Sequence, residues 1–230
     1  MSTSAPSAPA PVAAPEVVVI LHGVAISSRL TARLAGFLAA AGYEVHNLDY
    51  PSKTVPLAEL GPRWLAAKLA ELAVDRAPRL HFVTHSMGGL IVRGYLAAHR
   101  PANLGRVVNI VPPHHGSAVS DKLRRLPIIW RIIGRNLGAL GTGPDAYWRT
   151  LPPSADFEFG VIAGSFALNP IGWWFLERPH DGTVAERSTR LDGMADHITL
   201  PSNHTLILFR RRTAEQALAF LRTGRFARAT

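Results

Sequence analysis

Short apolar runs that alternate with helix-like segments constrain this chain more than any other feature of its sequence. The first run, residues 17–21, reads VVVIL without a polar interruption, which is typical of a strand buried on both faces of a parallel sheet. A segment with an apolar stripe of helical period follows, and Gly42 is well placed as its C-terminal cap. We expect Ser27 or Ser28 to cap the start of this helix, because a serine side chain accepts hydrogen bonds from its first free amide groups.

The same order of strand and helix recurs along the chain. Such alternation implies right-handed crossovers and an α/β fold, with a mostly parallel central sheet and helices on both faces. Residues 117–155 interrupt the order with apolar helical sequence and no convincing strand, so we predict a small helical cap insertion there. Further strands are predicted at residues 43–48, 80–84, 106–111, 157–163 and 197–200, with helices at 58–76 and 87–99 and a last helix behind a capping box at Thr213 to Gln216.

Chain length and cysteine content narrow the class of protein. The 230 residues fit one domain, which we place at residues 16–230 behind a disordered leader, residues 1–15, rich in Pro, Ala and Ser. The absence of cysteine excludes a disulfide framework, a thiolate nucleophile and a cysteine-bound metal. We recognise no signal peptide and no apolar segment long enough to span a membrane, so we expect a cytoplasmic protein.

The chain is basic, with a formal net charge of +9. A positive surface attracts acidic partners, although a run of charge is more often a solvated face. No nucleic-acid motif with interleaved aromatic residues accompanies the basic residues, so we expect no nucleic-acid partner. A weak association with an anionic membrane surface remains a prediction of this charge.

The segment around Ser86 carries the strongest chemical signal. The apolar run LHFVT leads into His85-Ser86-Met87-Gly88-Gly89, and a helix-like pattern starts at once. A sharp turn between a strand and a helix exposes a serine hydroxyl, and small residues after the serine let the turn approach neighbouring backbone. The start of the helix also directs free N–H groups at a developing negative charge. We therefore predict that Ser86 is a catalytic nucleophile.

Here the sequence resembles the α/β-hydrolase superfamily, and within it the bacterial lipase and esterase branch, over nearly the whole chain after residue 15. The G-x-S-x-G pattern of that superfamily is present with its first glycine replaced by Thr84. The pair His22-Gly23 after the first strand is similar to the segment that supplies one oxyanion-hole amide in such lipases. By position, the resemblance implies that the backbone N–H groups of Val24 and Met87 form the oxyanion hole.

The resemblance also implies that an acid and then a base follow the serine in the chain. Asp181, in the segment HDGTV, is the preferred acid, because a similar D-G-x-V segment carries the acid in related lipases. A turn-capping aspartate is the alternative for this residue. His204 is the preferred base, since it follows the last predicted strand and precedes the terminal helix. The remaining candidates are His197 as a fallback base and the carboxylates of Asp156, Asp192 and Asp196.

Other residues are predicted to surround the substrate. His114 and His115 have no matched third ligand, so we expect no metal site; their segment resembles an active-site wall of lipases, with Ser117 beside it. The apolar stretches 128–133 and 173–176 could line an acyl pocket, form a lid or pack in the core. The pocket candidates are His22, His85, His115, Ile129, Trp130, Trp173 and Trp174.

Together these patterns predict hydrolysis of carboxylic esters, with acyl or lipid esters favoured, through an acyl-serine intermediate. One alternative is acyl transfer, in which an alcohol other than water captures the same intermediate. Another is a non-catalytic binding protein on the same fold. No dinucleotide or phosphate-binding motif is present, so we expect no cofactor. The sequence leaves open the acyl chain length, the alcohol portion and the oligomeric state.

Overall fold

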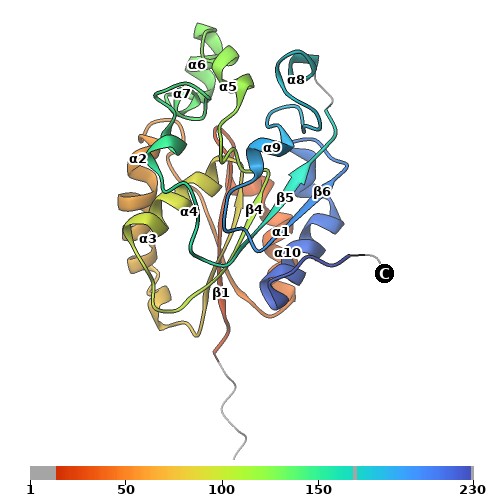
Figure 1. Cartoon of the computed structure of the whole chain (residues 1–230). Coiled ribbons are helices and arrows are strands. Elements are labelled where there is room, and N and C mark those ends of the chain that lie inside the picture. Colours follow the sequence, from red (N-terminus) through yellow and green to blue (C-terminus); the bar gives the residue numbers. More distant parts are fainter. Residues whose placement is uncertain (1–13, 168–169, 229–230) are drawn as a thin grey trace, which may run out of the picture.

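A parallel sheet of six strands forms the centre of the molecule (Figure 1). The computed structural model describes residues 14–167 and 170–228. Neighbouring strands follow the order β2-β1-β3-β4-β5-β6, so the direction in which strands are added reverses between β1 and β3. The strands are β1 (Val17–Leu21), β2 (Glu44–Leu48), β3 (Leu80–His85), β4 (Leu104–Ile110), β5 (Phe159–Gly164) and β6 (Asp196–Leu200).

The inner strand β1 is covered by apolar side chains on both faces. All five of its residues are buried. Val17, Val19 and Leu21 belong to one hydrophobic cluster, whereas Val18 and Ile20 belong to a second cluster. Since successive strand residues point to opposite faces of a sheet, the uninterrupted apolar run serves two separate cores.

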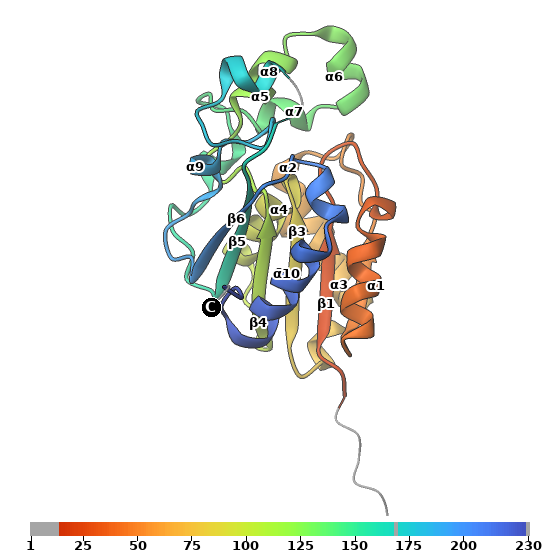
Figure 2. The ribbon, with the colours of Figure 1, turned by 90° about the vertical axis from the view of Figure 1, so that its right-hand side faces the viewer.

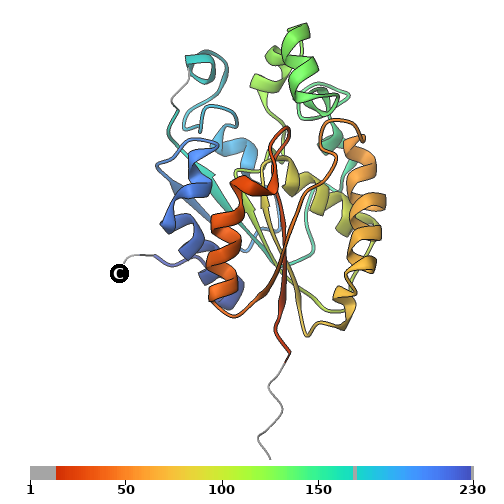
Figure 3. The same ribbon diagram turned by 180° about the vertical axis from the view of Figure 1, so that it is seen from behind.

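Two helical layers enclose the sheet (Figures 1 and 3). α1 (Ala32–Ala40) and α10 (Arg211–Thr223) cover one face, and α4 (Met87–Ala98) covers the other face beside the helical segment 57–71. The predicted α/β architecture, with helices on both faces of a parallel sheet, is confirmed. The segment 57–71 consists of α2 (Leu57–Glu59), the π-helical stretch η2 (Leu60–Leu65) and α3 (Ala66–Glu71).

The prediction that Ser27 or Ser28 caps α1 was wrong. A short 3-10 turn, η1 (Ser28–Leu30), comes first, and α1 starts after Thr31 with no side-chain cap. Ser28 donates its hydroxyl to Asp49 at 2.8 Å, so it is engaged outside the helix. Gly42 follows α1 with a φ of +100°, a conformation that favours glycine and agrees with its predicted capping position.

Two other predicted helix limits were wrong. The segment predicted to be helical to residue 76 ends at Glu71, because Ala73 takes a left-handed conformation with φ of +51° before the 3-10 turn η3 (Val74–Arg76). α10 begins two residues before the predicted capping box, and Thr213 lies inside its first turn with a buried hydroxyl that has no partner among the described residues. Arg210 enters the helix with its Nε bonded to Oγ of Ser202 at 2.9 Å, which fixes this earlier start.

Short helices gather beyond the carboxyl ends of the strands (Figure 2). The predicted cap region, residues 117–155, contains helices and loops but no strand of the sheet. Within the described ranges, no helix combines the length and the apolar character needed to cross a bilayer. The short elements at this end are α5 (Ala118–Leu123), α6 (Pro127–Ile133), α7 (Asn136–Ala139), η4 (Tyr147–Thr150), α8 (Pro170–Phe175), α9 (Glu186–Thr189) and η5 (Leu206–Phe209).

Candidate active site

Ser86 occupies a sharp turn between β3 and α4. Its φ of +54° and ψ of −120° lie in a region that L-residues rarely adopt, so the backbone is strained at this point. Its N–H donates to the carbonyl of Ile110 on β4 at 2.9 Å, which anchors the turn to the sheet. Ser86 is only 6% exposed, and it lines a cavity. The predicted strand-to-helix turn is therefore present at this serine.

The turn at Ser86 lies against the loop after β1 at a distance that requires glycine. A Cβ atom at Gly88 would lie 2.7 Å from the carbonyl oxygen of Leu21, and one at Gly23 would lie 2.9 Å from Nδ1 of His85. Neither contact is sterically acceptable, so these two glycines permit the approach. Because the strand order reverses between β1 and β3, the two loops meet where open α/β sheets commonly bind ligands.

Thr84 stands where the G-x-S-x-G pattern has its first glycine. Its hydroxyl donates to Oδ1 of Asn109 on β4 at 2.6 Å, and both side chains are buried. Nδ2 of Asn109 lies 3.4 Å from Nε2 of His114, which extends the polar contact beneath the site. Thr84, which is larger than the glycine of the pattern, is thus held by a hydrogen bond to Asn109 on the neighbouring strand β4.

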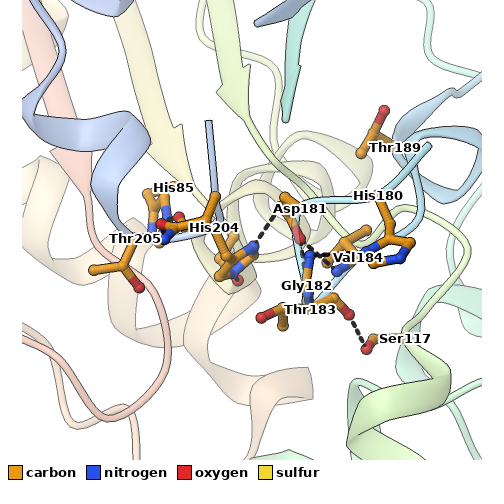
Figure 4. A network of polar contacts seen from close by, with 12 residues as sticks. His85, Ser117, His180, Asp181, Gly182, Thr183, Val184, Thr189, His204 and Thr205 are labelled. Atoms are coloured by element: carbon orange, nitrogen blue, oxygen red, sulfur yellow. Dashed lines mark hydrogen bonds and ion pairs between the residues drawn. The ribbon is translucent and has the colours of Figure 1, made fainter. Parts of the chain in front are cut away.

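His204 lies between Ser86 and Asp181, and hydrogen bonds join the three side chains. Nε2 of His204 is 2.9 Å from Oγ of Ser86, and Nδ1 is 2.6 Å from Oδ2 of Asp181. Figure 4 shows the imidazole of His204 directed at Asp181. A carboxylate only accepts hydrogen bonds, so Nδ1 carries the proton and Nε2 is left to accept from the serine hydroxyl. The structure therefore brings together the three residues that the sequence indicated.

A tight turn fixes the carboxylate of Asp181. Its Oδ1 accepts hydrogen bonds from the N–H groups of Thr183 at 2.8 Å and Val184 at 2.7 Å. Its backbone carbonyl accepts from the N–H of His204 at 3.0 Å. The turn-capping and acid interpretations of Asp181 are thus compatible, because one carboxylate oxygen caps the turn and the other faces the imidazole.

The other candidate acids and the fallback base have partners elsewhere in the fold. The side chains of Asp156 and Asp196 pair with Arg100 and Arg228, and His197 lies 3.3 Å from Glu186. The backbone of Asp192 forms a β-bridge with that of Ser154.

His85 holds the backbone of His204 by a hydrogen bond. Its Nε2 donates to the backbone carbonyl of His204 at 2.8 Å, and the two rings lie 5.0 Å apart (Figure 4). Burial, assisted by charge repulsion from His204 and His22, lowers the pKa of His85 to about 3. His85 is therefore neutral near pH 7, and its single ring proton serves the hydrogen bond that holds the backbone of His204.

An apolar cavity of about 290 Å³ opens beside Ser86. Ser117 lines it and donates to the carbonyl of Thr183 at 2.5 Å, which ties the cap to the turn of Asp181 (Figure 4). A predominantly apolar wall with a few placed polar groups is typical of small-molecule sites. Leu123, Ile133, Leu137 and Leu140 of the cap line the cavity, as do Val24, Ile26 and Val184.

The cap leucines were missed in the prediction of the pocket. Leu137 and Leu140 contribute to the cavity wall, as does Ile133, which belongs to the stretch 128–133 predicted to line an acyl pocket, form a lid or pack in the core. Gly134 ends α6 with a φ of +96°, so Ile133 and Leu137 lie on different helices, and their spacing along the chain gives no helical signal. The prediction concentrated instead on the aromatic residues of the region.

Among the predicted pocket residues that the structure describes, only His85 lies in the wall of this cavity. α6 projects away from the sheet (Figure 2), so its last turn reaches the cavity while Ile129 and Trp130 lie farther out. The others lie outside the wall: His22 is stacked on Tyr50 at 4.2 Å, His115 is set edge-on against Trp148 at 5.1 Å, and Trp173 and Trp174 are exposed.

His114 and His115 lie in different surroundings. His114 is buried, with its ring 6.1 Å from that of Phe159, and burial holds its pKa well below the usual range of histidine. His115 is exposed. Among the residues described by the structure, no group of three or more His, Asp or Glu side chains is arranged to hold a metal ion.

Comparison with known structures identifies the architecture. The mature lipase BlEst2 of Bacillus licheniformis superposes with a TM-score of 0.68 at 22% identity, over 96% of each chain. Phospholipase PlaB of Legionella pneumophila gives 0.66 at 18% identity, over 92% of this chain and 60% of that one. Esterase RhEst1 of Rhodococcus sp. ECU1013 gives 0.60 at 16% identity, over 91% of each chain.

These likenesses establish the fold as that of the α/β-hydrolases, in agreement with the resemblance read from the sequence. No protein-family model matches the chain, and no curated protein matches it by sequence.

Proposed function

We propose that this protein is a serine hydrolase that cleaves carboxylic esters through an acyl intermediate on Ser86. The observation that carries the proposal is the continuous hydrogen-bonded path from Oγ of Ser86 through His204 to Asp181, beside an apolar cavity. This order of nucleophile, base and orienting acid is what activates a serine hydroxyl, which is otherwise a weak nucleophile.

The first half of the reaction transfers the acyl group to the enzyme. Oγ of Ser86 attacks the ester carbonyl carbon while Nε2 of His204 takes the hydroxyl proton. The C–O bond to the alcohol then breaks, and His204 returns that proton to the leaving oxygen. Asp181 keeps the imidazole in the required tautomer and stabilises its cationic form.

The second half returns the enzyme to its starting state. Water attacks the carbonyl carbon of the acyl-Ser86 ester and gives a proton to His204. The bond to Oγ breaks, the carboxylic acid leaves, and Ser86 regains its proton from His204.

Two backbone N–H groups stabilise the oxyanion in this proposal, those of Val24 and Met87. Met87 is the first residue of α4, and the first N–H groups of a helix have no partner inside it. Val24 lines the cavity with Ser86 and follows Gly23, whose close packing against the turn supports this assignment. Each such donor contributes roughly 3 to 4 kcal/mol of transition-state stabilisation.

The lining of the cavity supports an acyl or lipid ester as substrate. Leu123, Leu137 and Leu140 offer an apolar surface to a hydrocarbon chain. Ser120 and Thr205 place hydroxyl groups at the same cavity, where the more polar alcohol portion of an ester would lie.

A panel of p-nitrophenyl esters of graded chain length tests the proposal. We expect turnover by the wild-type chain and loss of turnover in Ser86→Ala. Ser165→Ala is the matched control, because it removes a partly buried serine hydroxyl that lies outside the wall of this cavity. Ester turnover that survives in Ser86→Ala would overturn the proposal.

The same assay with an added acceptor alcohol separates hydrolysis from acyl transfer. We expect the free acid as the main product, because water is the proposed acceptor. A new ester as the main product would instead identify acyl transfer through the same intermediate.

A further inference from the structure

The helix α6 lies beyond the carboxyl ends of the strands (Figure 2), and it exposes large apolar side chains. Ile128 is 69% exposed and Ile132, one turn later, is 56% exposed. Trp130 and the preceding Leu126 are also about half exposed. Isolated exposed apolar residues are normal, but a contiguous group of this size marks an interaction surface.

The inner side of α6 is apolar as well. Ile129 and Ile133 are half-buried against the protein, and Ile133 reaches the cavity. Apart from the exposed Arg131, every residue of α6 is apolar, and a helix of this composition is normally buried on most sides. Because this chain covers only one side of α6, the outer side requires a different apolar environment.

α8 presents a second apolar group at the same end of the molecule (Figures 1 and 2). Trp174 is 82% exposed and Trp173 is 58% exposed. Phe175 of α8 lies under Nζ of Lys122 on α5, 4.7 Å from the ring centroid, which holds α8 next to the cap. Figures 1 and 2 both show α6 and α8 at the same end of the molecule. Tryptophan is enriched where proteins meet the interface between lipid and water.

The segment that carries α5, α6 and α7 is strongly cationic. Residues 118–139 contain the single acidic residue Asp121. Its Oδ2 accepts hydrogen bonds from the N–H and hydroxyl of Thr142, and its Oδ1 lies 3.8 Å from Nε of Arg124. The same segment contains five cationic residues: Lys122, Arg124, Arg125, Arg131 and Arg135.

This charge decides which partner the apolar surface fits. A second copy of the chain, related by twofold symmetry, would bring the same cationic segment of each copy face to face. An anionic bilayer instead offers hydrocarbon for the exposed side chains and negative headgroups for the surrounding arginines.

We propose that α6 and α8 form a docking surface for an anionic lipid bilayer, through Ile128, Ile132, Trp173 and Trp174 with Arg124 and Arg125. The cap residues Leu123 and Ile133 connect this surface to the cavity. The docked protein therefore presents its cavity to lipids of the membrane. The inference concerns binding, so it holds or fails independently of the proposed ester hydrolysis.

Sedimentation with lipid vesicles tests this inference on full-length Ser86→Ala protein, which keeps the result independent of any hydrolysis. We expect binding to vesicles of phosphatidylcholine with phosphatidylglycerol, and much weaker binding to phosphatidylcholine alone. Adding Ile128→Ser with Ile132→Ser, or Trp173→Ser with Trp174→Ser, is expected to weaken binding at least about tenfold. Phe209→Ser is the matched apolar control, because Phe209 is 41% exposed in a groove between α1 and α10.

The charge requirement has its own pair of variants. Arg124→Gln with Arg125→Gln is expected to lower the affinity for the anionic vesicles about tenfold or more. Arg211→Gln with Arg212→Gln removes the same charge from the exposed start of α10 and is expected to have a smaller effect. Equal effects of the two pairs would show that net charge alone drives binding and would overturn the proposed surface.

Two other results would also contradict the inference. One is no binding to either kind of vesicle by protein whose thermal unfolding is normal. The other is a dimer, measured by light scattering, that the α6 and α8 substitutions dissociate, since a second copy would then be the occupant of this surface.

Discussion

Ser86 and His204 are separated by 118 positions in the sequence, yet their side chains lie 2.9 Å apart at the carboxyl end of the sheet. The backbone of each residue is held by a hydrogen bond that takes no part in the proposed proton transfer. The N–H of Ser86 is bonded to β4, and the carbonyl of His204 is bonded to His85. The pair is therefore preorganised by the fold, which is the condition for efficient transfer of a proton between them.

Asp181→Asn should reveal the orienting role of the carboxylate. The amide can donate to Nδ1 of His204, which would favour the wrong tautomer and leave Nε2 protonated. We expect kcat for ester hydrolysis to fall by about 10⁴. Asp192→Asn is the control, because the backbone of Asp192 forms a β-bridge with Ser154 and Asp192 is not part of the cavity wall. Equal activity of the two variants would exclude the orienting role.

Thr84→Val should destabilise the strand below the nucleophile. The substitution preserves shape but leaves Oδ1 of the buried Asn109 without its hydroxyl donor. We expect the free energy of unfolding, measured in urea, to fall by about 1 to 3 kcal/mol. Thr84→Ser keeps the donor and should lose less. A Val variant as stable as the wild type would show that this hydrogen bond contributes nothing.

Among the elements, the strands and the turn at Ser86 were the most predictable. β1 is an uninterrupted apolar run that needs burial on both faces, and this requirement can be read from its residues alone. β3 is fully buried as well, although it carries His81, Thr84 and His85. The helix caps were not predictable in the same way. Ser28 and Thr213 both stand in sequences typical of caps. In the folded chain, however, the hydroxyl of Ser28 bonds to Asp49, and Thr213 is buried inside α10.

The site was predictable to the extent that its residues follow strands. Ser86, Asp181 and His204 each stand after a recognisable strand, so their order in the chain could be matched to a known arrangement. The cavity wall depends on how far α6 and α7 reach over the sheet. No local pattern fixes that distance, which is why Trp130 was predicted to line the cavity and Leu140 was missed.

Arg93 joins three elements from within α4. It is buried, and its guanidinium donates to the carbonyl oxygens of His114 and Pro152, while burial lowers its pKa to about 10. It therefore stays charged at neutral pH and clamps the loop after β4 to the loop before β5. No carboxylate pairs with it in the described part of the chain.

Arg93→Met should loosen this clamp. Hydrogen bonds from a charged donor contribute more than neutral ones, so we expect the free energy of unfolding to fall by about 2 to 3 kcal/mol. Arg100→Met is the control, since its ion pair with Asp156 is largely exposed to solvent and should contribute little to stability. Comparable losses in the two variants would contradict the clamping role.

At the scale of the whole molecule, buried histidines should make the fold sensitive to acid. Burial lowers the pKa of His85 to about 3 and holds that of His114 well below the ordinary value. Below about pH 6.5 these two imidazoles are protonated in the unfolded chain but stay neutral in the folded chain. Their contribution to stability is thus complete above that pH and is lost as the pH falls toward their folded-state pKa values.

Urea unfolding at pH 7 and pH 5 measures this effect. We expect the free energy of unfolding to fall by up to about 1.4 kcal/mol per pH unit for each such histidine. His85→Gln should show a shallower dependence on pH than the wild type. Equal stability of the wild type at the two pH values would contradict the account of the buried imidazoles.

The central claim is that the fold makes the hydroxyl of Ser86 a nucleophile, and covalent labelling tests it most directly. The chain is treated with a fluorophosphonate, and the modified residue is located by mass spectrometry of peptides. We predict one phosphonyl group, on Ser86, with labelling that is absent in Ser86→Ala and greatly slowed in His204→Ala. A folded wild-type chain that stays unlabelled, or that carries the group on another residue, would contradict the claim.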